Sequence, residues 1–350
     1  MTQTTLYASA LAKIGAERGK LLNETKLKTL TESKNLSELA TLLRDTNYQE
    51  QIAKVPLPLT SGKLERAFRE NLISSYVKVI KNSPNHASKY LWLYLLRFEV
   101  ENVKALIKST NANLSLEEKI GRIYLSAEDY LKKRSVMEET AKAPSIEQIV
   151  KALKKSIYAP ALNMGLQTYE EDGSTTCLDV LLDKTFYEKL FDSYKSLPQK
   201  EKPHAHFYAS IENDGFTLLT LLRGKNLNYE ANWLRLAVPP NNFYLGMETV
   251  EAMVTAADFE SALKIALDSH YGEFFVKTQN PEEIIANAEK AFKKAGLQHA
   301  KENRINETFN IGAPLAFMTQ KEAEVHNLTA LSSGVEAEIK PEDIQRHLLL

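Results

Sequence analysis

The residues best suited to chemistry are three acids that recur along the chain in the same setting. Glu99, Asp214 and Glu324 each lie seven residues after an aromatic side chain, and a small polar residue follows each acid three positions later. Carboxylates gathered around one axis would form a ring able to receive a basic partner, whereas acids on helices usually neutralise a nearby Arg or Lys. We favour local neutralisation and keep the ring as the functional hypothesis. The candidate positions are Glu99, Asn102, Asp214, Thr217, Glu324 and Asn327.

Three tyrosines form a second recurring set, spaced by 110 and then 113 residues. Tyr48, Tyr158 and Tyr271 each follow a hydroxyl residue by two positions and close an apolar pattern with helical periodicity. A period this long indicates one supersecondary unit copied three times. Burying an aromatic side chain contributes on the order of 1.5–3 kcal/mol, so we interpret the three tyrosines as core residues. The hydroxyl residues are Thr46, Ser156 and Ser269.

A third pattern, Leu-x3-Phe-x3-Leu-x3-Tyr, occurs at 64–76 and again at 182–194, with Phe292 as its remnant in the third copy. The offset is 118 residues here and 110 at the tyrosines, so the second copy is longer by eight residues. The extra residues must lie within 163–177, where Glu170-Glu171-Asp172-Gly173-Ser174 is typical of a turn. We therefore predict an exposed inserted loop at 163–177.

Composition excludes several classes of protein. The 350 residues carry a formal net charge of −1, which argues against a duplex nucleic-acid binder because such a protein needs a surplus of Lys and Arg. Cys177 is the only cysteine, so no intrachain disulfide can form and a reducing compartment is expected. The N-terminal residues do not resemble a signal peptide, and the longest strongly apolar stretch, 90–96, is too short to span a bilayer. We expect a cytoplasmic location.

No catalytic, cofactor or metal motif stands out. Gly15 and Gly19 are separated by three residues and Lys20 is followed by Leu21, whereas a phosphate-binding loop needs four residues and a Ser or Thr. His204 and His206 would point to opposite sides of a helix, and no acidic or cysteine cluster completes a metal site around them. We predict a protein that is not an enzyme and has no cofactor.

Helical periodicity dominates the chain, and no segment alternates with the period of a strand. Asn35, Ser145 and Asp258 are residues of the N-cap type, each placed before an apolar helical pattern. Pro239-Pro240 is the clearest internal boundary. The prediction is an all-α protein of three similar helical repeats, at 1–126, 127–240 and 241–350, arranged with pseudo-three-fold symmetry.

Several of these segments, in this order, resemble one family. Tyr7-Ala8-Ser9-Ala10 and the helix after it look like the opening of the family, and 42–48 (Leu-Leu-Arg-Asp-Thr-Asn-Tyr) and Pro341-Glu342-Asp343-Ile344 match later segments. The family is the C subunit of the A/V-type rotary ATPase (ATP synthase), equivalent to the d subunit of the vacuolar ATPase. The resemblance covers essentially the whole chain. Among the departures is Lys321, where the first two copies have Leu96 and Ile211.

The resemblance implies a funnel-shaped, non-catalytic adaptor of the central stalk, built from three subdomains. Such a protein sits on the cytoplasmic end of the membrane rotor ring, which consists of hydrophobic proteolipid subunits, and receives the foot of the stalk. It transmits torque between ATP turnover and ion transport. Under this hypothesis the helices near Glu99, Asp214 and Glu324 form the stalk socket. The alternative is a helical-repeat scaffold of another cytoplasmic complex.

Overall fold

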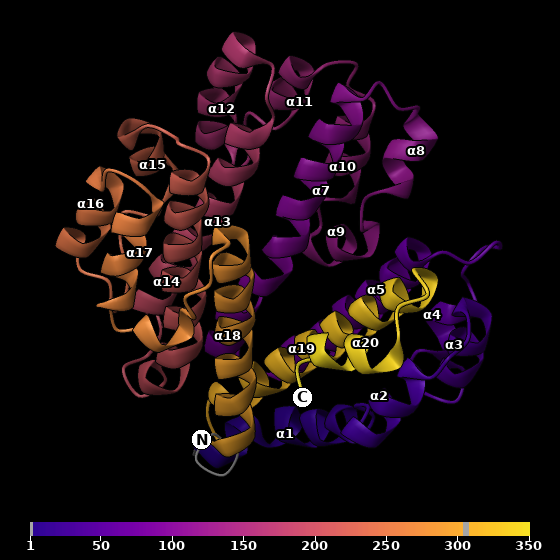
Figure 1. Cartoon of the computed structure of the whole chain (residues 1–350). Helices are drawn as coiled ribbons and strands as arrows, with labels where there is room; N and C mark the ends of the chain where they lie inside the picture. The colour runs from indigo at the N-terminus through magenta and orange to yellow at the C-terminus, as the bar shows by residue number, and fades with distance from the viewer. Residues whose placement is uncertain (1–2, 304–307) are drawn as a thin grey trace. The chain divides into compact units, whose positions relative to one another are not determined.

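The computed structural model describes residues 3–303 and 308–350. Within these ranges the chain forms α-helices and one 3-10 turn and contains no strand, which confirms the all-α prediction (Figure 1). The chain divides into two compact units, one made of residues 1–88 and 293–350 and the other of residues 89–292. The N- and C-terminal parts of the sequence therefore build the first unit together.

The first unit is organised around two long helices, α5 and α19, which lie side by side along their length (Figure 1). Both bury an apolar face, with Phe68 and Tyr76 on α5 and Phe317 and Leu328 on α19 less than 2% exposed. Helix α1 packs against the same pair. The helices of this unit are α1 (Gln3–Arg18), α2 (Glu24–Thr31), α3 (Leu36–Leu43), α4 (Gln49–Ile52), α5 (Ser61–Asn82), α19 (Gly312–Glu336) and α20 (Pro341–His347).

The second unit is centred on α13, which packs against α7, α12 and α14. Its short helices pack on the long ones, as α9 and α11 do on α7 and α17 does on α14. The elements are α7 (Leu93–Asn111), α8 (Leu116–Gly121), α9 (Leu125–Leu131), α10 (Arg134–Ala141), α11 (Ile146–Ala152), α12 (Ala159–Asp172), α13 (Thr176–Lys195), α14 (Lys202–Asn226), α15 (Ala231–Ala237), α16 (Met247–Thr255), α17 (Phe259–Leu267) and η1 (Gly272–Phe274). Helices α6 (Asn85–Leu91) and α18 (Pro281–Glu302) contribute residues to both units.

The three predicted helix starts are confirmed. The side chains of Asn35, Ser145 and Asp258 cap α3, α11 and α17, each accepting a hydrogen bond from the backbone N–H three residues later. The Leu-Phe-Leu-Tyr patterns lie on α5 and α13, as their spacing predicted. Local sequence therefore determined where these elements begin.

The prediction of an exposed inserted loop at 163–177 is wrong, because most of this segment is helical. Residues 163–172 continue α12, which begins near Pro160 and ends at Gly173, and only 173–175 separate α12 from α13. Gly173 adopts a left-handed conformation with φ of 72°, which favours glycine and ends the helix. The turn-type residues thus mark the end of α12. The extra residues make α12, which follows Tyr158, longer than α4, the four-residue helix that follows Tyr48.

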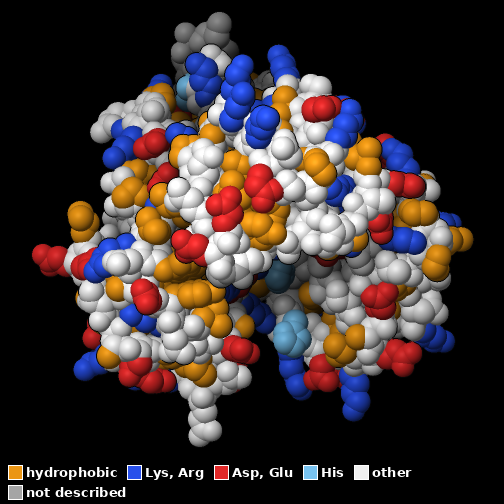
Figure 2. Space-filling view, turned by 90° about the horizontal axis from the view of Figure 1, so that it is seen from above, with side chains coloured by type: hydrophobic (Ala, Val, Ile, Leu, Met, Phe, Trp, Pro, Cys, Tyr) orange, Lys and Arg blue, Asp and Glu red, His pale blue; other side chains and the backbone are white. Residues whose placement is uncertain are grey.

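The division into repeats at 1–126, 127–240 and 241–350, and their pseudo-three-fold funnel, stay predictions. Residue 240 lies in the connection between α15 and α16, but residue 126 lies inside α9, so a boundary there would cut a helix. On the face shown in Figure 2, basic and acidic side chains are interspersed over most of the surface. This mixture agrees with the formal net charge of −1.

Candidate functional site

Each of the three recurring acids is buried on a long helix and accepts a hydrogen bond from one of the three recurring tyrosines. The acids lie on α7, α14 and α19. Each tyrosine comes four to six residues after the end of a short helix that starts at a capped residue, namely α3, α11 or α17. The two sets of residues are therefore the two halves of one buried contact that occurs three times. The pairs are Tyr48 with Glu324 at 2.6 Å, Tyr158 with Glu99 at 3.0 Å, and Tyr271 with Asp214 at 3.1 Å.

The hydroxyl residue before each tyrosine fixes the turn that presents it. The Oγ atoms of Thr46, Ser156 and Ser269 accept hydrogen bonds of 3.2–3.3 Å from the backbone N–H of the tyrosine two residues later. Hydroxyl side chains commonly stabilise turns in this way. The repeated hydroxyl-x-Tyr spacing thus encodes one local turn that directs a tyrosine into the core.

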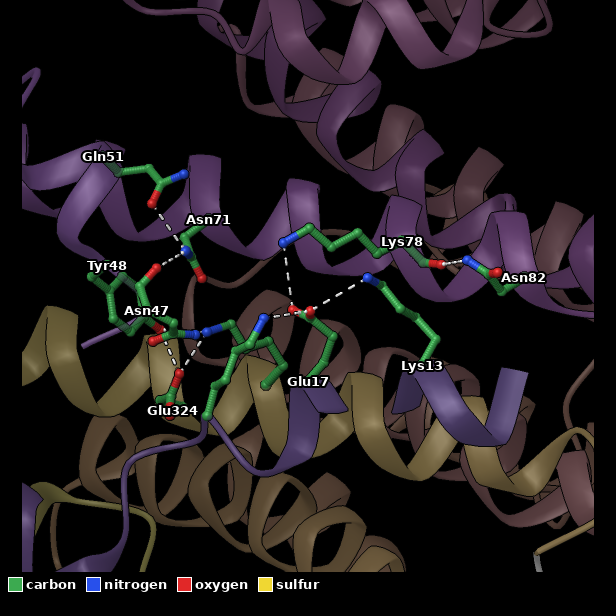
Figure 3. Close-up of polar contacts among 11 residues, drawn as sticks. Lys13, Glu17, Asn47, Tyr48, Gln51, Asn71, Lys78, Asn82 and Glu324 are labelled. Atoms are coloured by element: carbon green, nitrogen blue, oxygen red, sulfur yellow. Dashed lines mark hydrogen bonds and ion pairs between the residues drawn. The ribbon is translucent and has the colours of Figure 1, made fainter. Parts of the chain in front are cut away.

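Figure 3 shows Tyr48 and Glu324 close together. This pair is neutralised by a buried lysine on the same helix as the acid. Lys321 Nζ donates to Glu324 Oε1 at 2.6 Å and to the Tyr48 hydroxyl at 2.9 Å, and its side chain is fully buried. The second oxygen of Glu324 accepts the backbone N–H of Leu22. Burial raises the pKa of Tyr48 well above its usual value, and Glu324 adds to this effect, so the hydroxyl stays a donor.

A second buried carboxylate, Glu17 on α1, lies in the same unit and is surrounded by lysines (Figure 3). Its nearest cations are Lys20 at 2.9 Å, Lys78 at 3.5 Å and Lys13 at 3.9 Å. Burial raises the pKa of Glu17, but the lysines, Lys20 most strongly, outweigh burial, so its pKa lies below the usual value. The carboxylate therefore ties α1 to α5, which carries Lys78.

The Tyr158–Glu99 pair receives its countercharge from outside the helix that carries the acid. Lys133, in the connection between α9 and α10, donates to both oxygens of Glu99, at 2.7 and 2.8 Å. The side chain of Lys133 is 35% exposed, so its ammonium lies at the edge of the core while Glu99 lies inside it. This ion pair connects α7 to the α9–α10 segment.

The Tyr271–Asp214 pair is stabilised by backbone groups. The oxygens of Asp214 accept the N–H groups of Phe243 at 2.8 Å and Tyr244 at 2.7 Å, and Asn213 Nδ2 lies 3.4 Å from Oδ1. Burial raises the pKa of Asp214, although these backbone donors oppose the shift. The carboxylate thus holds the segment between α15 and α16 against α14.

The small polar residue three positions after each acid also binds backbone. Asn102 exchanges two hydrogen bonds with the backbone of Tyr124, and Asn327 does the same with Leu349, in each case 22 residues later. Thr217 instead donates to Asn213 O and to Asn242 Oδ1. Asn102 and Asn327 therefore form the same amide clasp, which holds a following segment, whereas Thr217 makes a different set of contacts.

All six candidate residues are at most 4% exposed in this chain, and their polar atoms are engaged within their own units. Glu99 and Glu324 pair with lysines, as the interpretation of local neutralisation expects, whereas Asp214 is held by backbone N–H groups. The assignment of the six residues to a stalk socket stays a prediction. Sequence reasoning did not identify Lys133 or Asn213 as partners. The one available signal was Lys321, because a lysine at an otherwise apolar position of a helix needs a buried anion.

Two of the other residues considered for chemistry lie in buried or partly buried surroundings. Cys177 is buried, and His206 Nδ1 lies 3.1 Å from the Tyr194 hydroxyl at the start of α14. Over residues 3–303 and 308–350, no group of three or more His, Cys, Asp or Glu side chains is arranged to hold a metal ion. In the same part of the chain, each helix is too short or too polar to cross a membrane.

Comparison with known proteins gives a consistent result over nearly the full chain. The family described as ATP synthase (C/AC39) subunit matches residues 10–347. The C subunit of the A-type ATP synthase of Methanocaldococcus jannaschii is 27% identical over 347 residues, covering 98% of this chain and 86% of the relative. The protein of the same name from Thermococcus kodakarensis is 26% identical, covering 97% of this chain and 90% of the relative.

Proposed function

The chain belongs to the ATP synthase (C/AC39) subunit family, and from this membership we propose that it is a non-catalytic adaptor of the central stalk in an A/V-type rotary ATPase. In this role it links the stalk to the membrane rotor ring of hydrophobic proteolipid subunits. It transmits torque between ATP turnover and ion transport and works at the cytoplasmic side of the membrane, attached through the complex.

The observation that carries the proposal is the buried tyrosine–carboxylate contact found three times. A torque-transmitting adaptor needs stiffness, because deformation of the adaptor would dissipate the work of rotation. Each contact joins a long helix to a turn distant in the sequence, and satisfied buried polar groups hold a unique arrangement of the elements that they connect. Three such contacts in helical units fit a rigid part better than an active site.

We further propose that the six candidate residues shape the stalk socket from inside. Glu99, Asp214 and Glu324 would position the helices and connections that meet the stalk, while other side chains on those elements make the contact. This version of the socket hypothesis is compatible with the burial of all six residues.

Co-purification tests the proposal directly. A tagged full-length chain, expressed in cells rich in the complex, is expected to recover a small, very hydrophobic ring-forming polypeptide together with coiled-coil stalk subunits. Recovery of neither would favour the alternative, a helical-repeat scaffold of another complex. The isolated chain is expected to hydrolyse no ATP, and sustained hydrolysis by pure protein would contradict its non-catalytic role.

A conservative triple variant tests the internal role of the candidate residues. Tyr48→Phe, Tyr158→Phe and Tyr271→Phe together remove only the three donors to the buried acids and keep the aromatic volume. We expect a folded protein with weaker stalk binding and a lower rate of coupled ion transport. Tyr169→Phe, which removes an exposed hydrogen bond to Asn111, is the matched control. Equal stalk binding by the triple variant and the control would reject the internal role.

A further inference from the structure

The contact around Glu99 includes an additional buried carboxyl group. Glu128 on α9 has an exposed fraction of 0%. Its Oε1 accepts a hydrogen bond of 2.7 Å from Asn102 Nδ2, while its Oε2 is buried and has no hydrogen-bond partner among the residues that the structure describes. An ionised carboxylate with an unpartnered oxygen in the core is costly, and the same group carries a smaller penalty when it is protonated.

The orientation of Asn102 explains why only one oxygen of Glu128 has a donor. The Tyr124 N–H donates to Asn102 Oδ1 at 2.7 Å, which fixes the side-chain amide with its Nδ2 toward Tyr124 O and Glu128 Oε1. The matching amide, Asn327, holds Leu349 with the same pair of backbone hydrogen bonds. Glu128 is therefore an addition to a clasp that the fold already uses elsewhere.

The charges around Glu128 do not balance when every group is ionised. Lys133 is engaged by both oxygens of Glu99, so one ammonium serves two buried carboxylates and one negative charge is left over. Lys133 is also tied to Glu128 through the backbone, since its N–H donates to Glu128 O at 2.9 Å. The nearby Asp129 is paired with Arg134. The ionisable groups that face Glu128 are Glu99 on α7, Lys133 after α9, Asp129 on α9 and Tyr158 before α12.

We propose that the buried Glu128 carboxyl group holds a proton, and that this proton neutralises the Glu99–Lys133–Glu128 cluster and strengthens the attachment of α9 to α7. The ligand of this site is the proton itself. The attachment weakens as the solution becomes alkaline, because the released proton leaves two anions beside one cation in the core. This property goes beyond the proposed adaptor role and does not depend on it.

The direction of the effect follows from the environment of the carboxyl group. Burial raises the pKa of Glu128 to about 7, and the neighbouring Glu99 adds to the shift, while the hydrogen bond from Asn102 and the charge of Lys133 oppose it. The pKa in the folded state lies above the ordinary value of 4.5. Protonation therefore favours the folded state, and its contribution is complete below about pH 4.5 and is lost as the pH rises to about 7.

A carboxyl titration of the full-length chain tests the site. With ¹³C-labelled glutamate, NMR is expected to show one carboxyl resonance that titrates close to pH 7 in the wild type. That resonance should be absent in Glu128→Gln, which keeps the acceptor for Asn102 and removes the charge. It should remain in Glu138→Gln, the control at a half-exposed glutamate of α10. A wild type whose glutamates all titrate below about pH 6 would overturn the proposal even if the variant does not fold.

Thermal unfolding and hydrogen exchange test the structural consequence. From about pH 5 to about pH 9 the wild-type Tm is expected to fall by roughly 5 °C more than the Tm of Glu128→Gln, because only the wild type loses the proton of Glu128. Histidines and other titrating groups contribute equally to both proteins, so the comparison isolates Glu128. After correction for the intrinsic exchange rate, amides of α9 should lose protection at high pH in the wild type alone. Identical pH profiles for the two proteins would overturn the coupling.

Discussion

Glu324 and Asp214 occupy matching positions on α19 and α14, and both accept a tyrosine hydroxyl, yet they are stabilised by different kinds of group. Glu324 is paired with the buried ammonium of Lys321. Asp214 is held by two backbone N–H groups of the segment after α15. The two contacts therefore share a buried carboxylate and its tyrosine, while the cost of each buried charge is offset by the donors that its own surroundings provide.

The two contacts also differ in how far apart their partners lie in the chain. Tyr271 and Asp214 are 57 residues apart, whereas Tyr48 and Glu324 are separated by 276 residues. The first unit therefore has to bring both ends of the chain together before its tyrosine–carboxylate contact can form. Closing a longer loop costs more conformational entropy, so the contact in the first unit has to offset a larger cost.

The largest expected effect is on the fully buried ion pair. Lys321→Met removes the ammonium bonded to Glu324 and should lower the free energy of unfolding by about 3–5 kcal/mol, because an uncompensated charge stays in the core. Urea unfolding followed by circular dichroism measures the change. The double variant Lys321→Met/Glu324→Gln should recover most of the loss, and a double variant no more stable than the single one would refute this pairing.

The ion pair between the buried Glu99 and the partly exposed Lys133 should tolerate the loss of its lysine better. Lys133→Met is expected to cost about 1–3 kcal/mol, because water can reach the place of a lysine that already lies at the edge of the core. The same urea experiment compares it with Lys321→Met, the matched change in the first unit. If Lys133→Met is the more destabilising of the two, the extent of burial does not determine how much each ion pair contributes to the free energy of unfolding.

The contact held by backbone groups should depend least on its tyrosine. Tyr271→Phe is expected to cost about 1 kcal/mol, since Asp214 keeps the N–H groups of Phe243 and Tyr244. Tyr169→Phe, at an exposed hydrogen bond, should cost close to nothing. A loss for Tyr271→Phe as large as that for Lys321→Met would show that the hydroxyl, and not the backbone, stabilises this carboxylate.

The smallest effect concerns the pH dependence of the same carboxylate. Burial raises the pKa of Asp214 above its ordinary value of 3.8, so protonation favours the folded state and this contribution is lost as the pH rises above about 4. Asp214→Asn should therefore lack a small decrease in stability that the wild type shows between acid and neutral pH. Stability measured by urea unfolding at several pH values checks the slope, and parallel curves would contradict it.

Local patterns predicted much of the fold correctly. The capping residues Asn35, Ser145 and Asp258 begin helices. The all-α class follows from the helical periodicity of the apolar residues, because these residues form the faces that pack in the core. The prediction of a loop at 163–177 was wrong because the residue types that form turns also end helices, as Gly173 ends α12. At the candidate site, sequence located the acids and tyrosines but did not show that they bind one another, because an offset between repeats carries no information on distance in space.

The sequence by itself determined which residues repeat, where the helices begin, and which family the chain belongs to, because these depend on short-range chemistry and on order along the chain. Only the tertiary structure decided that Tyr48 meets Glu324 and Tyr158 meets Glu99, and that Lys321 and Lys133 supply their countercharges. A buried charge takes its partner from whatever packing brings within hydrogen-bonding distance, and that neighbour can lie three residues away or on the other end of the chain.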